Sequence, residues 1–369
     1  MIRIWTYLPQ YKEEKKQIHA AVKRVFESGR LILGKSVASF EKEFAEYCQV
    51  KHGIGVNNGT DALFIALKAL GIGKGDEVIT VPNTAIPTVS SICAAGATPV
   101  FVDVDPDTFL IDANQIEKHI TKKTKCILPV HLYGQCCNMD HINQIAKKHN
   151  LYVIEDCAQG HGSLWKDRIA GSMSTIAAFS FYPTKILGAY GDAGMVVTNS
   201  EEFARKARML HMYGMEPNGE YYSIIQGYNT RLDEVQAEIL RFKLTRINIY
   251  IKKRQAIAAR YYKYLKDTSI KLPKVQNNSM HAYYLFVCRH KNRDKILEHM
   301  KKNDIIIDVS YKYPIHLMKA YKYLGYKEGD FPITELASKQ IFSLPIYPEL
   351  AVKDQDKIIK ALKSFDKLS

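Results

Sequence analysis

Apolar and polar residues follow two different rhythms along this chain. Near the N-terminus, apolar side chains recur every three or four positions, which predicts amphipathic helices over 12–28 and 36–47. Ser36 stands at the start of the second helix and is expected to cap it. From about residue 53, short continuous apolar runs alternate with helical patterns, which is typical of buried, mostly parallel strands. These runs are 54–56, 77–80, 99–104, 126–130, 151–154, 175–179 and 195–198.

The pattern changes after about residue 200. A helical pattern from Asp233 to about Leu265 is expected to lead into a C-terminal part with strands at 283–287 and 305–309. A chain of 369 residues exceeds what one hydrophobic core usually supports, so two domains are expected. The sequence therefore predicts an α/β fold, with a large, mostly parallel-sheet domain over 1–245 and a smaller C-terminal α+β domain over 246–369.

The composition, with 46% hydrophobic and 24% charged residues, is that of an ordinary globular protein. The N-terminus lacks the apolar core of a signal peptide and no run reaches membrane-spanning length, so we expect a soluble, cytoplasmic protein without membrane contact. The seven cysteines are scattered and show no CxxC spacing. Adjacent Cys136 and Cys137 give only a weak metal or redox signal, so reduced thiols and no metal site are expected.

The formal net charge of +14 raises the question of nucleic-acid binding. The lysines are spread along the whole chain, and no basic arm, zinc finger or RNP motif accompanies them. Solvated helix faces explain them better, so no nucleic-acid partner is expected. A positive field would still favour capture of a doubly anionic substrate.

Two of the predicted strands carry reactive side chains at their carboxyl ends. The strand 151–154 is followed by Glu155, Asp156 and Gln159, and the strand 175–179 by Ser180 and Lys185. Open α/β sheets build ligand sites at this edge, so both sets can converge on one pocket. Because neighbouring strand residues face opposite sides, only one of the two acids easily points into that pocket.

A lysine, a carboxylate and a phosphate cradle together are what pyridoxal 5′-phosphate (PLP) requires. Lys185 would bond to the coenzyme, and Asp156 would keep the pyridine nitrogen protonated. The plainer alternative is a solvated lysine and a helix-capping aspartate. The glycine-rich stretch 188–194 that follows Lys185 favours the first interpretation.

A third segment, Asn58-Gly59-Thr60-Asp61, lies where a strand turns into a helix. Glycine lets the backbone approach an anion, and the first-turn N–H groups with the Thr60 hydroxyl can bind a phosphate there. Taken alone, the segment is better explained as a plain helix cap, and it is the lysine and aspartate segments downstream that favour the phosphate site. The polar loop 227–234 and the loop 313–316 also allow two interpretations, because each can be a structural turn or a contact with a ligand.

Together these segments resemble the nucleotide-sugar aminotransferases of the DegT/DnrJ/StrS family, which have the PLP fold type I, aspartate-aminotransferase-like architecture. The resemblance covers nearly the whole chain. It is carried by 34–44, 58–63, 75–78, 131–135, 155–159, 179–194, 228–238 and 344–348.

The resemblance implies PLP, with its amino form PMP, as the cofactor, and it implies a role for each matching residue. Lys185 would be the Schiff-base lysine, Asp156 the partner of the pyridinium nitrogen, and Gln159 the contact of the phenolic oxygen. Gly59, Thr60 and Ser180 would bind the phosphate.

The family also implies an obligate homodimer with composite active sites, in which Asn229 reaches the phosphate of the neighbouring subunit's cofactor. Tyr313, His316 and Arg231 match positions on the substrate side.

The chain departs from the family pattern at two places. Many relatives carry an aromatic residue that stacks on the cofactor where this chain has Ala85, and relatives often show His-Tyr where it has Ser310-Tyr311. Lys185 also separates the aminotransferases from family members that place a histidine there and act as dehydratases.

The segment 183–194 resembles members that aminate the 3-keto position of 6-deoxyhexoses. The expected reaction transfers an amino group from L-glutamate to C-3 of a dTDP-3-keto-6-deoxyhexose, giving a dTDP-3-amino-3,6-dideoxyhexose for surface glycans such as O-antigen. The alternatives are a C-4 aminotransferase acting on a UDP- or dTDP-4-keto sugar, and a regulatory DNA-binding protein.

Overall fold

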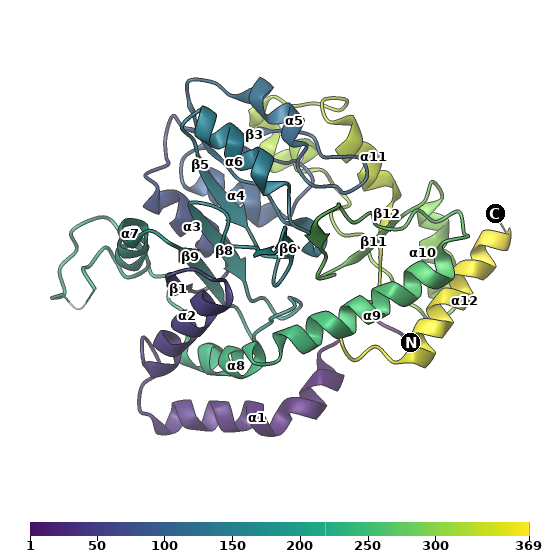
Figure 1. Cartoon of the computed structure of the whole chain (residues 1–369), viewed down its shortest axis with the longest axis horizontal. Helices are drawn as coiled ribbons and strands as arrows, with labels where there is room; N and C mark the ends of the chain where they lie inside the picture. The colour runs from purple at the N-terminus through teal and green to yellow at the C-terminus, as the bar shows by residue number, and fades with distance from the viewer. Residues whose placement is uncertain (218, 369) are drawn as a thin grey trace.

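The computed structural model describes residues 1–217 and 219–368, and its centre is a seven-stranded sheet (Figure 1). Its strands are β1 (His52–Val56), β2 (Glu77–Thr80), β3 (Thr98–Phe101), β4 (Thr124–Ile127), β5 (Tyr152–Asp156), β8 (Ile176–Ser180) and β9 (Gly194–Thr198). Their spatial order is β1-β9-β8-β5-β4-β2-β3. Neighbours run parallel except β9, which is antiparallel to both β1 and β8. The predicted α/β class with a mostly parallel sheet is confirmed.

Helices pack around this sheet and bury it. They are α1 (Leu8–Glu27), α2 (Lys35–Tyr47), α3 (Gly59–Ala69), α4 (Ile86–Ala94), α5 (Ala113–Ile116), α6 (Met139–Lys148), α7 (Glu201–His211) and α8 (Glu234–Leu244). Every residue of β8 and β9 is buried. The continuous apolar runs in the sequence arise because these central strands have no solvent-facing side.

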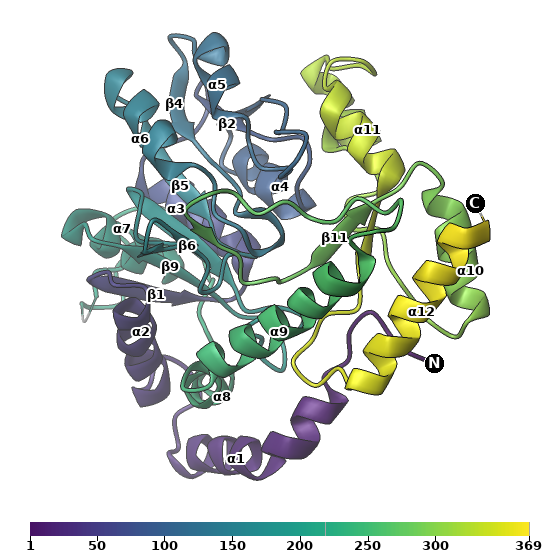
Figure 2. The same ribbon diagram turned by 45° about the vertical axis from the view of Figure 1, so that its right-hand side comes forward.

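A second, smaller unit follows. It contains α9 (Ile247–Leu265), β11 (Phe286–Arg289), α10 (Arg293–Lys302), α11 (Pro332–Gln340), β12 (Ile341–Leu344) and α12 (Val352–Leu368). The strands β11 and β12 pair antiparallel. The chain begins beside this unit, next to α12 (Figure 2), where Ile2 joins its hydrophobic core and pairs with Ile305.

Short elements complete the fold. A small sheet joins β6 (Leu164–Trp165), β7 (Arg168–Ile169) and β10 (Ser279–Met280), and 3-10 turns cover Glu117–His119, Leu132–Gly134, Ile315–Leu317 and Lys319–Leu324. Among the helices of the described residues, none is long and apolar enough to cross a membrane.

The expected cap of the second helix is wrong. The N-cap of α2 is Gly34, and no side chain of the helix start caps it. Instead the buried carboxylate of Glu234, 200 residues later, accepts hydrogen bonds from the backbone N–H groups of Gly34, Ser36 and Val37 at 2.8 to 2.9 Å. A carboxylate at this end also complements the helix dipole.

The predicted helix from Asp233 to Leu265 is two helices. The Thr245 hydroxyl donates to the Phe242 carbonyl at 2.7 Å, which offers the backbone an alternative to the helical ladder, and Arg246, with φ −111° and ψ −3°, departs from ideal helical angles while staying in the right-handed region.

The predicted strand at 283–287 begins only at Phe286, because Tyr283 adopts a left-handed φ of 52°. The segment 305–309 forms single bridges at Ile305 and Asp308 rather than a strand.

Candidate active site

A cavity of about 420 Å³ opens at the carboxyl ends of β5 and β8. Asp156 ends β5 and Ser180 ends β8, and these neighbouring strands are parallel, so their terminal side chains reach the same edge of the sheet. Of the seven residues predicted to bind the cofactor, six line this cavity: Gly59, Thr60, Asp156, Gln159, Ser180 and Lys185.

One end of the cavity is the N-terminus of α3. Asn58 caps this helix, accepting the Asp61 N–H at 2.8 Å, which leaves the N–H groups of Gly59 and Thr60 facing the cavity without an intrahelical partner. A Cβ atom added at Gly59 would lie 2.5 Å from the Ser180 Cβ. Only glycine therefore lets the helix start approach Ser180, and the two segments together form an anion cradle.

Asp156 also lines the cavity and is 3% exposed. Its Oδ2 accepts a hydrogen bond from Thr88 Oγ1 at 2.8 Å and its Oδ1 accepts the Ala158 N–H at 3.1 Å. Burial raises the pKa of Asp156 against these two donors and the nearby Lys185, which lower it. A cationic partner in the cavity would reverse this shift, as a protonated pyridine nitrogen does.

Glu155 points away from the cavity, as strand alternation predicts. Its carboxylate accepts hydrogen bonds from His131 Nε2 at 2.8 Å and from the N–H groups of Gly171 and Met173. Burial acts to raise the pKa of Glu155, but these donors and the His131 charge lower it overall. Glu155 is thus a buried anion that anchors β5.

His131, Glu155 and Cys157 are the one group of metal-ligand type in the described residues, with ligand atoms within 4.8 Å of one another. Their atoms are already engaged, because His131 Nδ1 accepts the Cys137 N–H while Nε2 donates to Glu155. Burial raises the pKa of the Cys157 thiol well above its usual value, so the thiolate that a metal prefers is disfavoured. The group is a hydrogen-bonded cluster.

Gln159 is held in one orientation. Its Oε1 accepts the Tyr133 N–H at 2.8 Å, so the amide nitrogen must be the other atom, and it donates to Tyr311 Oη at 2.6 Å. The second Nε2–H stays free for a ligand oxygen in the cavity. Both tyrosines have left-handed backbone angles, φ 61° and 65°, a strain that structures often retain beside functional groups.

Lys185 lies in the loop after β8. Its ammonium group lies 4.5 Å from the centre of the Tyr284 ring, whose hydroxyl hydrogen-bonds Thr184 Oγ1 at 3.1 Å. An aromatic face attracts the cation and holds it at the cavity wall. Sequence reasoning found Lys185 and Asp156 but missed Thr88, Tyr311 and Tyr284, which come from distant segments without a local signal.

The remaining predicted residues lie outside this cavity. Asn229 is exposed, and the Arg231 guanidinium lies over the Tyr213 ring at 5.4 Å. Tyr313 is 65% exposed, whereas His316 is buried and its Nε2 contacts Glu335 at 3.1 Å. Within one chain, none of these four side chains lines the space around Lys185.

Ala85 does line the cavity, as the cap of α4. Tyr182 is the one aromatic side chain among the lining residues, and it is 52% exposed.

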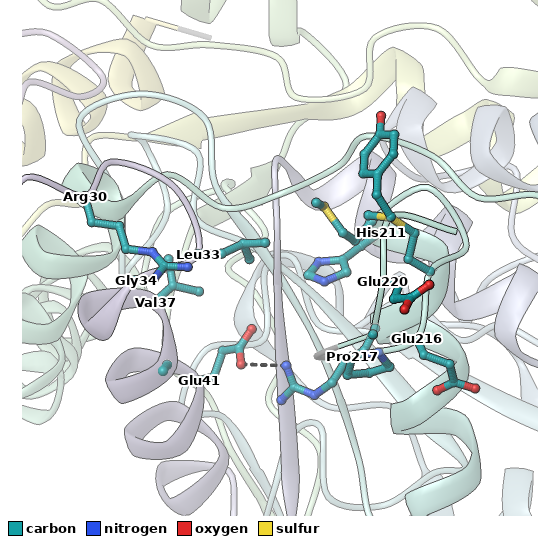
Figure 3. A pocket seen from close by; sticks show the side chains of 15 residues that line it. Arg30, Leu33, Gly34, Val37, Glu41, His211, Glu216, Pro217 and Glu220 are labelled. Atoms are coloured by element: carbon teal, nitrogen blue, oxygen red, sulfur yellow. Dashed lines mark hydrogen bonds and ion pairs between the residues drawn. The ribbon is translucent and has the colours of Figure 1, made fainter. Parts of the chain in front are cut away.

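A larger cavity of about 600 Å³ lies elsewhere, between α2, α7 and the loop that follows α7 (Figure 3). Glu41 faces Arg208 across it and pairs with it at 2.8 Å. His211 Nδ1 is also hydrogen-bonded, to the Gly55 carbonyl oxygen at 3.2 Å. These groups are thus paired with the protein itself, and no lysine, serine or cysteine is among the described residues that line this cavity, so the smaller cavity is the candidate active site.

The comparisons with known proteins decide between the interpretations of this site. The model of the DegT/DnrJ/EryC1/StrS aminotransferase family matches residues 12–363. This chain belongs to that family. It is an aminotransferase, and PLP is the family's cofactor; solved relatives hold PLP or PMP.

Two relatives are dTDP-amino-sugar transaminases. The chain is 48% identical, over 98% of its length and 97% of the relative, to dTDP-3-amino-3,4,6-trideoxy-alpha-D-glucose transaminase of Micromonospora megalomicea subsp. nigra. It is 43% identical to dTDP-3-amino-3,6-dideoxy-alpha-D-galactopyranose transaminase of Aneurinibacillus thermoaerophilus, over 95% of the chain and 96% of the relative.

The crystal structure of DesV from S. venezuelae has a TM-score of 0.96 to this structure. It is 40% identical, covering 98% of this chain and 97% of DesV.

The residues of the site fit this family's cofactor. The cradle at Gly59 and Ser180 suits a phosphate, the buried carboxylate of Asp156 suits a protonated ring nitrogen, and the free Gln159 N–H suits a phenolic oxygen. When bound, PLP supplies an aldehyde that amines attack and a ring that takes up electrons. Lys185 is held at the cavity wall, and a lysine amine at this place would be able to take up or give a proton beside a bound coenzyme.

Proposed function

We propose that this aminotransferase moves an amino group from L-glutamate to C-3 of a dTDP-linked 3-keto-6-deoxyhexose for surface-glycan biosynthesis. The main support is the cavity, which brings together Lys185, Asp156 and the cradle formed by Gly59 and Ser180. The chain is also 43–48% identical to dTDP-3-amino-sugar transaminases. The names of the two relatives share a 3-amino group but describe sugars that differ at C-4. The proposal therefore concerns only the carbon that receives the amine.

Lys185 is the proposed catalytic residue, and Gly59, Thr60, Asp156, Gln159 and Ser180 are the proposed cofactor contacts. Among the described residues that line the cavity holding Asp156, Lys185 is the one that carries an amine, the group that can act there as nucleophile and base.

A composite homodimeric site is the second part of the proposal. Asn229 is exposed and away from its own chain's cavity, so it is available to a neighbouring one. Large apolar side chains nearby in the sequence are also exposed, namely Tyr221 at 88%, Tyr222 at 73% and Ile224 at 55%. Exposed apolar patches of this kind mark protein interfaces. Arg231, Tyr313 and His316 remain proposed substrate-side residues on the strength of the family resemblance.

The reaction is tested with dTDP-3-keto- and dTDP-4-keto-6-deoxyhexoses, each incubated with L-glutamate, followed by location of the new amine by NMR. Amination at C-3 alone supports the proposal, and amination at C-4 alone contradicts it. Lys185→Ala is expected to abolish turnover with both sugars. The Lys206→Ala variant, a surface lysine paired with Glu202, is the matched control and keeps activity.

The composite site is tested by mixing two inactive variants, Lys185→Ala and Asn229→Ala. In a mixed dimer one site carries both changes and the other carries neither, so about half of the native activity per mixed dimer returns. If Asn229 serves its own chain's site, each site keeps one change and no activity returns.

A further inference from the structure

The loop that carries Lys185 follows β8 directly. Residues 181–189, which we call the lysine loop, are all described by the structure and contain no helix or strand. The ends of the lysine loop are tied together, because the Ala189 N–H donates to the Phe181 carbonyl at 2.7 Å. Inside it, the Lys185 N–H donates to the Tyr182 carbonyl at 2.8 Å. The place of the Lys185 amine therefore depends on what anchors the rest of this loop.

One face of α8 provides that anchor. The Lys243 ammonium donates a hydrogen bond to the Gly188 carbonyl and lies 5.3 Å from the centre of the Tyr190 ring. Two helical turns earlier, on the same face, the Gln236 amide pairs with both main-chain groups of Tyr190. It accepts the N–H of Tyr190 at 2.9 Å and donates to its carbonyl at 3.4 Å. The main chain after Lys185 is thus bonded to α8 at two points.

The lysine loop is tightly packed where Lys243 binds it. A Cβ atom added at Gly188 would overlap the Pro183 carbonyl oxygen, so the end of the loop lies directly against its beginning. Lys185 lies between these two positions in the chain. Because a close-packed segment transmits displacement, a shift of Gly188 would move the main chain that carries the Lys185 side chain.

Neutralisation of nearby acids does not explain Lys243. Its side chain is buried, 4% exposed, and it forms no ion pair with a carboxylate of the described residues. Glu14 and Glu349 are the acidic charges that act on it. They pair instead with Arg246 at 3.0 Å and with Lys253 at 3.7 Å. Burial lowers the pKa of Lys243 to about 8, which leaves it mostly cationic at neutral pH. A buried ammonium is costly, so its direct bond to the lysine loop calls for a role.

Resting on the proposed function, we propose that Lys243 and Gln236 are positioning residues that hold the Lys185 amine toward the coenzyme site. Neither is among the described residues that line the cavity, so both act through the main chain of the lysine loop. A reacting group that is displaced by about 1 Å can lose about 100-fold in rate. The cradle at Gly59 and Ser180 binds the phosphate separately, so the affinity for the coenzyme and the placement of the amine can be measured apart.

The test measures how fast the apoenzyme bonds PLP through Lys185, followed by absorbance. Lys243→Met keeps the length of the side chain but removes the donor. In this variant the rate of bonding and the rate of the L-glutamate half-reaction fall about 10- to 100-fold. The Kd for PMP, measured by calorimetry, is unchanged, because PMP has no aldehyde for Lys185 to bond. Lys243→Arg restores part of both rates, since it keeps a charged donor.

A second variant, Gln236→Leu, removes the other anchor without touching a buried charge. It gives the same pattern more weakly, because the bonds that it removes join neutral groups. Arg241→Gln is the matched control on α8, since Arg241 pairs with Glu43 at 2.6 Å and with Glu238 at 2.9 Å. Its rates should match those of the native enzyme.

The proposal is overturned if Lys243→Met and Gln236→Leu both keep the native rates, or if Arg241→Gln loses as much as they do. It is also overturned if the affinity for PMP falls as far as the rates, which would mark a general structural role. If Lys243→Met does not fold, Gln236→Leu decides. Neither rate involves the sugar, so a native enzyme that bonds PLP through Lys185 but aminates only C-4 would refute the proposed function alone.

Discussion

Thr88 donates a hydrogen bond from its hydroxyl to Oδ2 of Asp156 at 2.8 Å, and this bond fixes the carboxylate at the base of the cavity. Because its one proton is used there, Thr88 must accept from Thr84 Oγ1, which lies 2.9 Å away. Two buried hydroxyl groups from the α4 region thus form a short relay that ends on Asp156.

Thr88→Val should therefore weaken coenzyme binding. The substitution keeps the shape of the side chain but removes the donor, and the burial that already raises the pKa of Asp156 then acts unopposed on Oδ2. A hydrogen bond to a charged group contributes about 1.5–3 kcal/mol, so the Kd for PLP should rise about 10- to 100-fold. Titration of the apoenzyme by absorbance measures it. Thr84→Val, one step removed, should change Kd less, and equal effects would contradict the relay.

Tyr311→Phe should alter the coenzyme's spectrum rather than the fold. Without its acceptor, the Gln159 amide is no longer directed, and its free N–H supports the phenolic oxygen less well. The midpoint of the spectral pH titration should move upward, because the ionised phenolic oxygen loses a donor. The accompanying loss in kcat should be about fivefold, from about 1 kcal/mol. An unchanged titration in a folded variant would remove Gln159 from this role.

His161 should make stability depend on pH. Its ring is buried, neither nitrogen has a partner at normal hydrogen-bond geometry among the described residues, and burial lowers its pKa from 6.5 to about 3. The folded protein holds the ring neutral while the unfolded chain takes up a proton below about pH 6.5. The stability from this group is therefore complete above pH 6.5 and is lost as pH falls toward 3, by up to about 1.4 kcal/mol per pH unit.

The variant His161→Leu tests this dependence of the free energy of unfolding on pH. Leucine packs against Phe179 and Phe181 without unpaired nitrogens, so the free energy of unfolding should rise at pH 5 and vary less between pH 5 and 7. Urea unfolding of the apoenzyme at several pH values measures both.

Glu234→Ala should destabilise the fold by about 2–3 kcal/mol. The change removes the acceptor of three N–H groups at the start of α2 and leaves them buried without partners. Glu234→Gln keeps one acceptor oxygen and should lose about half as much. Thermal unfolding measures both, and a neutral Glu234→Ala would show that water replaces the cap.

The parts of the site that could be predicted from the sequence are those with a local pattern. Asp156 and Lys185 each follow a buried apolar run, and parallel strands bring such ends together. Gly59 and Ser180 could be foreseen for the same reason. Thr88 could not, nor could the contact of Tyr311 with Gln159, since these two residues lie in a helix and a loop where their residue types are ordinary. Their roles arise only when distant segments pack.

The features of the fold divide in the same way into those that the sequence predicts and those that it does not. The existence of most strands and helices follows from periodic patterns, which tertiary packing preserves. The cap of α2 and the break between α8 and α9 depend on single contacts, Glu234 with Gly34 and Thr245 with Phe242. Such contacts leave no periodic trace, so the sequence predicted a serine cap and one continuous helix.

The junction between the two units of the chain has a mechanical consequence. The carbonyls of Tyr133 and Gly134 accept the N–H groups of Leu285 and Ala282 at 3.1 and 2.8 Å, and a Cβ atom at Gly134 would lie 2.7 Å from the Tyr284 nitrogen. These main-chain bonds hold the segment around Tyr284, whose ring contacts Lys185, against the turn at 132–134. The wall of the cavity beside Lys185 should accordingly keep its position throughout turnover.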